Sequence, residues 1–152
     1  MALTTVEARK QLLDGLAEAI DELGYTLAAL GAAYEQLDEH NADRLEEVLF
    51  RPAQVAYGRA KRTHEQFAAR HGIPTVSFAA QSPGLPSTGA KGFIGNAVEA
   101  AGEADRKLAA LQDSPMLVEV GDVQLRSGLA EVRELVGGLG PRARELVRTL
   151  GR

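Results

Sequence analysis

The apolar residues between positions 6 and 37 recur in a pattern that constrains this chain more than any other feature. They alternate at intervals of three and four residues, which is the heptad spacing of a helix packed on other helices: Leu13, Leu16, Ile20, Leu23, Leu27, Leu30, Tyr34 and Leu37. Val6 extends this stripe toward the N-terminus, and Arg9 interrupts it. Thr4 or Thr5 is predicted to cap the helix, with Glu7 completing a capping box with Thr4. Because a polar helix with one apolar stripe is stable only when that stripe is covered, the pattern predicts a helix inside a larger helical core.

The apolar stripe loses its register at Asn41 and Arg44 and resumes one residue out of phase at Leu45. Asn41 is a favourable N-cap, because its side chain can accept a hydrogen bond from a backbone amide of the first helical turn. We therefore predict a tight turn over residues 38–41 and a second helix that starts at Asn41. A single bent helix stays open as the alternative, because this stretch contains neither glycine nor proline.

The second predicted helix ends at Gly72, since glycine commonly terminates a helix after residues such as Arg70 and His71. Pro52 lies inside this helix and predicts a kink near residues 49–51, because proline lacks a backbone N–H. The predicted core residues of this helix share the apolar spacing: Leu45, Leu49, Ala53, Ala56, Ala60 and Phe67.

Residues 73–88 contain three prolines and are predicted to form one long irregular loop. Ile73, Val76 and Phe78 are apolar enough to attach the first half of this loop to the helices. A short strand at 75–79 is an alternative, although the sequence shows no partner strand for it.

A third helix is predicted after Ser87 or Thr88, with apolar residues in heptad spacing: Ile94, Ala97, Ala101, Ala104, Leu108 and Leu111. Ser114 as N-cap and Pro115 as first helical residue then open a fourth helix. That helix would bury one apolar set: Val118, Leu125, Leu129, Val132, Val136 and Leu139.

The start and the end of the fourth helix are less regular. Residues 118–125 also alternate in the manner of a hairpin, so a helix start as late as Asp122 stays open. The glycines within 137–140 should break the helix, and a short last helix should begin at Pro141.

Together these segments predict an all-α protein, an antiparallel up-and-down four-helix bundle with a kinked second helix and a short C-terminal helix. We expect residues 1–152 to form a single domain, because 45% hydrophobic and 25% charged residues are typical of a globular domain of this size.

The chain has no cysteine, which excludes disulfides, thiolate metal sites and cysteine nucleophiles. It has neither the pattern of a signal peptide nor an apolar run of membrane-spanning length, so we expect a cytoplasmic protein. Its richness in Ala, Leu, Arg and Gly suggests a bacterial gene of high GC content.

Charge is uneven along the chain. Residues 1–50 carry three basic and eleven acidic side chains, whereas residues 51–72 carry five basic side chains and one acidic one. We expect the acidic helix to pair with the basic one through flanking ion pairs. Arg59, Arg62 and Arg70 share one predicted face and would be the footprint of a nucleic-acid partner. We do not expect nucleic-acid binding, because the formal charge is −4 and aromatic residues are only 5%.

No motif for catalysis or metal binding is present. Di-metal helical bundles need Glu three residues before a ligating His, and the residues at those positions before His40, His64 and His71 are not Glu. The chain also lacks a Gly-x-Ser-x-Gly or Ser-x-x-Lys motif. The sequence therefore predicts a protein that is not an enzyme, with no catalytic residues, no metal ligands and no cofactor.

The segment 84–92 has two glycines and a lysine in the manner of a phosphate-binding loop, but Gly92 stands where that loop needs Ser or Thr. A weaker interpretation is an anion site formed by Thr88, Gly89 and Lys91 at a helix N-terminus. The structural alternative is that the glycines here form a slim face where two helices touch closely.

We expect the protein to act through its helix surfaces, by self-assembly as a dimer or larger coiled-coil oligomer or by contact with another helical protein. Tyr57, Phe78 and Phe93 are candidate exposed anchors for such contacts. The alternative function is the binding of a small molecule or anion near residues 73–92.

Overall fold

The computed structural model describes residues 3–150, and every regular element among them is helical. The α-helices are α1 (Thr5–Gln36), α2 (Glu39–Leu45), α3 (Arg51–Arg70), α4 (Gly89–Asp113), α5 (Pro115–Val120), α6 (Val123–Gly137) and α7 (Leu139–Leu150). A π-helical turn, Glu46–Phe50, joins α2 to α3, and a 3₁₀ turn, Pro86–Thr88, precedes α4. The all-α prediction is confirmed. Within the described residues neither the strand at 75–79 nor the hairpin at 118–125 forms.

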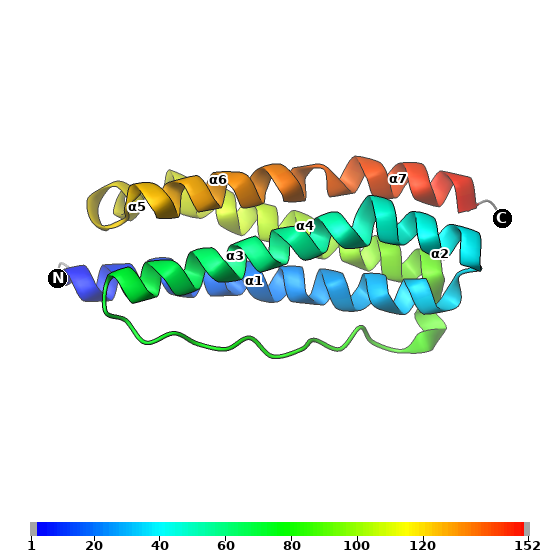
Figure 1. The fold of residues 1–152 in the computed structure, drawn as a ribbon, viewed down its shortest axis with the longest axis horizontal. Helices are drawn as coiled ribbons and strands as arrows, with labels where there is room; N and C mark the ends of the chain where they lie inside the picture. The colour runs from blue at the N-terminus through cyan, green and yellow to red at the C-terminus, as the bar shows by residue number, and fades with distance from the viewer. Residues whose placement is uncertain (1–2, 151–152) are drawn as a thin grey trace.

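The long helices lie side by side, but their directions differ from those of an up-and-down bundle (Figure 1). α1 runs along the molecule and α3 runs back beside it. Residues 71–85, here called the crossover, then return along the length of the molecule as an extended chain. α4 consequently starts at the far end and points the same way as α3. The long irregular loop is confirmed, whereas the strict up-and-down order of consecutive helices is not.

The core forms mainly between two pairs of helices, because α1 packs most extensively on α4 and α3 on α6. Most of the predicted stripe of α1 is buried, and Leu23 and Ile20 are fully inaccessible to solvent. Leu27 and Tyr34 are only half-buried. The buried face is wider than the heptad stripe, since α1 contacts both α3 and α4 and therefore also buries alanines between the leucines. Val6 is 51% exposed, so its place in the stripe is a wrong prediction.

A turn separates the first two helices as predicted, but it lies at residues 37–38, earlier than the predicted 38–41, and has a different cap. Leu37 and Asp38 are not helical, so the single continuous helix is excluded. Asp38 is the N-cap of α2, and its Oδ1 accepts a hydrogen bond from the backbone N–H of Asn41 at 2.8 Å. The prediction that Asn41 caps this helix is therefore wrong. Asp38 and Asn41 are both favourable N-cap residues. Here the Asp38 carboxylate, three residues before Asn41, accepts the backbone N–H of Asn41.

The irregularity predicted at Pro52 takes the form of the π-helical turn just before it. The backbone N–H of Arg51 donates to the carbonyl of Glu46, five residues earlier. A proline ring collides with the carbonyl four residues back in a regular α-helix, and the wider π turn relieves that collision.

α3 ends at the predicted glycine. Gly72 has φ +68°, the left-handed conformation that favours glycine. The N–H of Ile73 donates to the carbonyl of Ala68 at 2.9 Å and that of Gly72 to Ala69 at 3.3 Å, which is the Schellman pattern. The C-terminal end of α3 therefore directs the chain into the crossover.

The C-terminal third differs from its prediction in three places. The Ser114 cap and Pro115 start are confirmed, but the predicted fourth helix is two helices. α5 ends at Val120, and α6 follows with Asp122 as its cap, which is the later start that the sequence left open. Val118 is 77% exposed, so its core assignment is wrong. α7 starts at Leu139, not at Pro141, because proline is tolerated in the first turn of a helix, where its missing N–H has no partner to lose.

Candidate functional site

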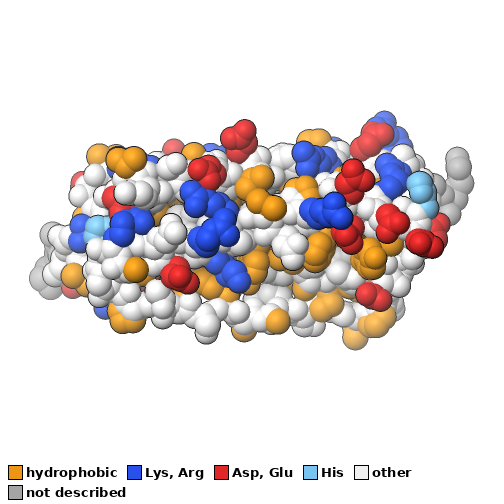
Figure 2. Space-filling model, viewed as in Figure 1, with side chains coloured by type: hydrophobic (Ala, Val, Ile, Leu, Met, Phe, Trp, Pro, Cys, Tyr) orange, Lys and Arg blue, Asp and Glu red, His pale blue; other side chains and the backbone are white. Residues whose placement is uncertain are grey.

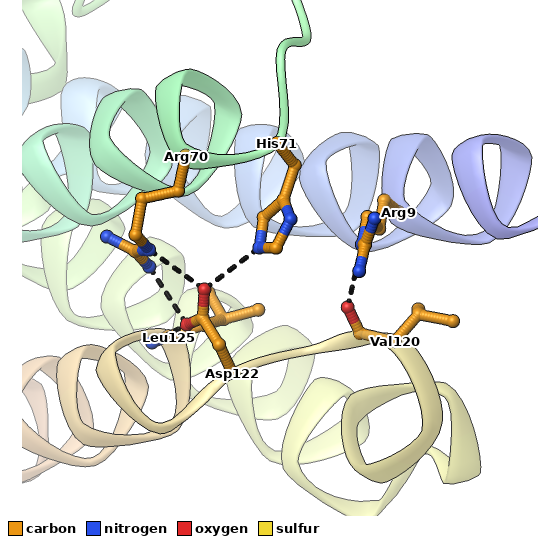
Figure 3. A network of polar contacts seen from close by, with 6 residues as sticks. All are labelled: Arg9, Arg70, His71, Val120, Asp122 and Leu125. Atoms are coloured by element: carbon orange, nitrogen blue, oxygen red, sulfur yellow. Dashed lines mark hydrogen bonds and ion pairs between the residues drawn. The ribbon is translucent and has the colours of Figure 1, made fainter.

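A network of charged side chains ties together the end of the molecule at which the crossover begins (Figure 3). Arg70 donates to both carboxylate oxygens of Asp122, at 2.8 and 2.9 Å, and Nε2 of His71 lies 3.0 Å from Oδ2. The same carboxylate caps α6 by accepting the N–H of Leu125 at 2.7 Å. Burial by itself would raise the pKa of Asp122, but the hydrogen bonds from Arg70, Leu125 and His71 outweigh it and lower the pKa to about 2. A carboxylate saturated in this way is a structural clamp between α3 and α6, not a catalytic base.

Arg9, which interrupts the apolar stripe of α1, belongs to the same end of the molecule. Its Nε donates to the backbone carbonyl of Val120 at 3.0 Å, at the C-terminal end of α5 (Figure 3). Helix ends leave carbonyls without intrahelical partners, and a guanidinium is a strong donor for them. The exception in the sequence pattern is therefore a helix-end contact.

The predicted basic face lies on α3, and Figure 2 shows blue side chains gathered over its middle. Arg59 donates to Glu131 of α6 at 2.6 Å, and Arg70 is held by Asp122. Arg62 is the member of the trio without an ion pair to any residue between 3 and 150. Two of the three arginines thus serve to join α3 to α6.

The ion pairs do not follow the prediction that the acidic first helix pairs with the basic helix. Among residues 3–150, the ion pair that α1 forms is between Glu18 and Lys107 of α4, at 3.4 Å. α4 in turn pairs with α6 through Asp105 and Arg133, at 2.9 Å. Each charged helix forms ion pairs with the helix that it faces. The net charges of the sequence segments do not identify that neighbouring helix.

Thr88, Gly89 and Lys91, the predicted anion site, lie at the start of α4. They line a recess of about 410 Å³ together with Gln36, Leu37, Asp38, Asn41, Ala90, Gly92 and Leu150. Gly89 has φ +78°, and a side chain on Gly92 would collide with that of Thr88. The carboxylate of Asp38 lies in the same recess, so an anion bound there would face a negative charge.

A second space, here called the α4–α7 groove, shares Lys91 with that recess. Its volume is about 400 Å³, and its lining comes from α4 and α7: Lys91, Ile94, Gly95, Val98, Ala143, Arg144, Val147 and Arg148. The uncharged lining residues are all apolar or glycine, and the charged ones are all basic. A Cβ built on Gly95 meets no atom within 4 Å, so this glycine faces open space and not a close helix contact.

The predicted aromatic anchors are less exposed than expected. Phe93 is 1% exposed and belongs to the core, so its assignment as an exposed anchor is wrong. Tyr57 and Phe78 are half-buried. Lys61 Nζ lies 4.5 Å from the ring centroid of Tyr57, and Phe78 packs edge-on against His64.

The three histidines lie in different surroundings: His40 is exposed, His64 is 4% exposed, and His71 belongs to the Asp122 network. Over residues 3–150 there is no cluster of three His, Asp or Glu side chains that could hold a metal ion. Nor does that part of the chain contain a helix with the length and apolarity needed to cross a membrane.

Comparisons with models of protein families, with curated proteins and with solved structures found no match to this chain. The function is therefore inferred from the geometry of its own residues. The α4–α7 groove was missed at the sequence level, although Gly95 and the four-residue spacing of Ala143 and Val147 are visible in the sequence. The direction of the crossover decides which two helices form the groove. The sequence pattern does not encode that direction.

Proposed function

We propose that this protein is a non-enzymatic helical bundle that binds an acidic amphipathic helix of another protein in the α4–α7 groove. The observation that carries this proposal is the lining of the groove, in which an apolar floor is flanked by basic side chains alone. An amphipathic helix with acidic flanks has the complementary surface.

The shape of the floor supports a helical occupant. Ile94 and Val98 are spaced by four residues on α4, as are Ala143 and Val147 on α7. Ile94 and Ala143 are buried and form the bottom of the groove, whereas Val98 and Val147 are half-buried and can contact the side chains of a third helix. Gly95 adds open space in which a leucine of the partner can fit.

The flanks support an acidic partner. Arg144 forms no ion pair with any residue in the range 3–150, and Arg148 is paired only with Glu145, one helical turn away on the exposed surface. Exposed charges of this kind contribute little to stability, but they steer a partner of opposite charge. Binding should therefore weaken as salt concentration rises.

The test uses a fluorescent peptide of about 20 residues, long enough to form a helix, with a leucine stripe and glutamate flanks. We expect saturable binding by anisotropy, and at least a tenfold weaker affinity for Arg144→Glu, in which an attraction becomes a repulsion. Gly95→Leu should abolish binding by filling the groove, and it should not unfold the protein because nothing lies within 4 Å of the added Cβ.

Two controls keep the result specific. Arg126→Glu places the same charge change on an exposed arginine of α6 outside the groove, and it should leave affinity unchanged. A peptide with lysine flanks should bind at least tenfold more weakly. Equal binding of both peptides, or binding that survives Gly95→Leu, contradicts the proposal. A dimer seen by light scattering and lost in Gly95→Leu would make a second copy the occupant and would overturn the assignment of another protein.

An anion site at Thr88, Gly89 and Lys91 is the second candidate function, since the positive end of α4 favours an anion in their shared recess while the Asp38 carboxylate opposes it. Inorganic phosphate should then raise the melting temperature of the wild type and not that of Lys91→Gln. An equal shift in both proteins excludes this candidate.

A further inference from the structure

A separate space lies between α3 and the crossover, here called the crossover pocket. Its volume is about 590 Å³, and its walls include Lys61, Arg62, His64 and Glu65 of α3 and Val76 and Phe78 of the crossover. Sites for small molecules typically have volumes of roughly 300–1,000 Å³ and combine apolar walls with a few polar groups. This pocket has both properties, and it lies on different elements from the α4–α7 groove.

His64 is the buried polar group of the pocket. It is 4% exposed, and its ring meets the ring of Phe78 edge-on, with centroids 5.4 Å apart and planes at 87°. Burial lowers the pKa of His64, and the backbone of Leu13 and the charge of Asp14 oppose that effect only in part. The imidazole is therefore neutral near pH 7.

The rim of the pocket carries a small net positive charge. Lys61 and Arg62 are cations, Glu65 is an anion and His64 is neutral, so the four side chains sum to one positive charge. Arg62 is exposed and forms no ion pair with any residue from 3 to 150. A single negative charge on a ligand would balance this rim.

The crossover forms the apolar wall and is held at its other end by few contacts. Tyr25 Oη donates to the carbonyl of Pro83 at 3.5 Å, and Gln36 Nε2 donates to the carbonyl of Pro86, just beyond the crossover, at 2.8 Å. Phe78 packs on the core, whereas Val76 is 58% exposed. A wall made of extended chain can shift to admit a flat ligand without breaking a helix.

We propose that the crossover pocket binds a small monoanionic aromatic compound, with its ring against Phe78 and Val76 and its carboxylate at Arg62 and Lys61. This inference is independent of the proposed partner helix.

The test uses indole-3-acetate as the probe and its neutral amide as the comparison, with isothermal titration and ¹⁵N amide shifts as readouts. We expect saturable binding of the acid, shifts confined to residues 58–65 and 76–78, and at least tenfold weaker binding of the amide. Arg62→Gln and Phe78→Ala should each reduce affinity about tenfold.

Arg126→Gln, the same change on an exposed arginine of α6, is the matched control and should bind as the wild type does. Arg62→Gln changes an exposed side chain, so it keeps the test valid if Phe78→Ala destabilises the protein. The proposal is overturned if the acid shows no saturable binding below about 10 mM, or if acid and amide bind equally. Amide shifts located elsewhere, or an equal loss of affinity in Arg126→Gln, would overturn it as well.

Discussion

α3 and α6 lie close together at Gly128, and this contact gives a sharp test of how the helices pack. Gly128 is buried, and a Cβ built on it would lie 2.5 Å from Oγ1 and 2.6 Å from Cγ2 of Thr63. Thr63 is 4% exposed, and its hydroxyl donates to the carbonyl of Arg59 at 2.8 Å. The substitution Gly128→Ala therefore places a methyl group inside an occupied space.

The expected effect is the balance of two opposing contributions. Alanine in a helix interior is more stable than glycine by up to about 1 kcal/mol. Overpacking a core costs about 1–3 kcal/mol, and a β-branched threonine cannot rotate away without losing its hydrogen bond to Arg59. We therefore expect Gly128→Ala to lower the free energy of unfolding by about 1–2 kcal/mol. For a chain of this size, that corresponds to a melting temperature lower by about 2–8 °C.

The assay is chemical denaturation of four variants and the wild type: Gly128→Ala, Thr63→Ala, the double variant and Gly31→Ala. Thr63→Ala removes both atoms that collide, so the double variant with Gly128→Ala should show a favourable coupling of about 1 kcal/mol. Gly31→Ala is the matched control, because Gly31 is inside α1 and nothing lies within 4 Å of its Cβ position. It should stabilise by up to about 1 kcal/mol. Should Gly128→Ala be as stable as the wild type while Gly31→Ala behaves as expected, the close packing of α3 on α6 described above would be wrong.

Four further substitutions test the core, a helix end and the charge network. Leu23→Asp should abolish cooperative thermal unfolding because Leu23 is fully buried, whereas Glu22→Ala at the solvent edge should change stability by less than about 0.5 kcal/mol; equal effects would refute the burial of this face. Gly72→Ala should cost about 1 kcal/mol in denaturant titrations because of its φ of +68°, and a neutral result would contradict the Schellman end. The Asp122 pKa falls from 3.8 to about 2 on folding, so this group stabilises the protein above pH 4, and that contribution disappears as pH falls toward 2. Over this range we expect Asp122→Asn to remove about 1–2 kcal/mol of the wild-type pH dependence, and an unchanged slope would refute the clamp.

Helix ends were the features that sequence reasoning predicted best. Thr4, Ser114 and Gly72 all lie where predicted, and the side chain of Thr4 accepts the N–H of Glu7 at 3.1 Å. Caps act within four residues, so the local sequence contains the information needed. The error at Asn41 arose because Asp38 can cap as well, and the choice between them depends on where the preceding helix ends.

Charge partners and exposed sites were predicted less well. The sequence identified Arg59 and Arg70 as a basic face, but Glu131 and Asp122 hold them because α6 lies beside α3. Val118 follows a buried spacing and is nevertheless exposed, because the break after Val120 turns α5 away from the line of α6. The errors in charge pairing share one cause, since each ion pair joins residues far apart in the chain.

The spacing of apolar residues determined by itself that this chain is helical and where the buried faces of the long helices are centred, because a period near 3.6 residues is a local property. The direction of α4 was decided only in the tertiary structure. An extended chain of about 15 residues can span roughly 50 Å, which exceeds the roughly 30 Å length of α3, so the crossover is long enough either to turn at one end or to cross the whole molecule. Packing of α4 on α1 selects the crossing, and that selection creates both the α4–α7 groove and the crossover pocket.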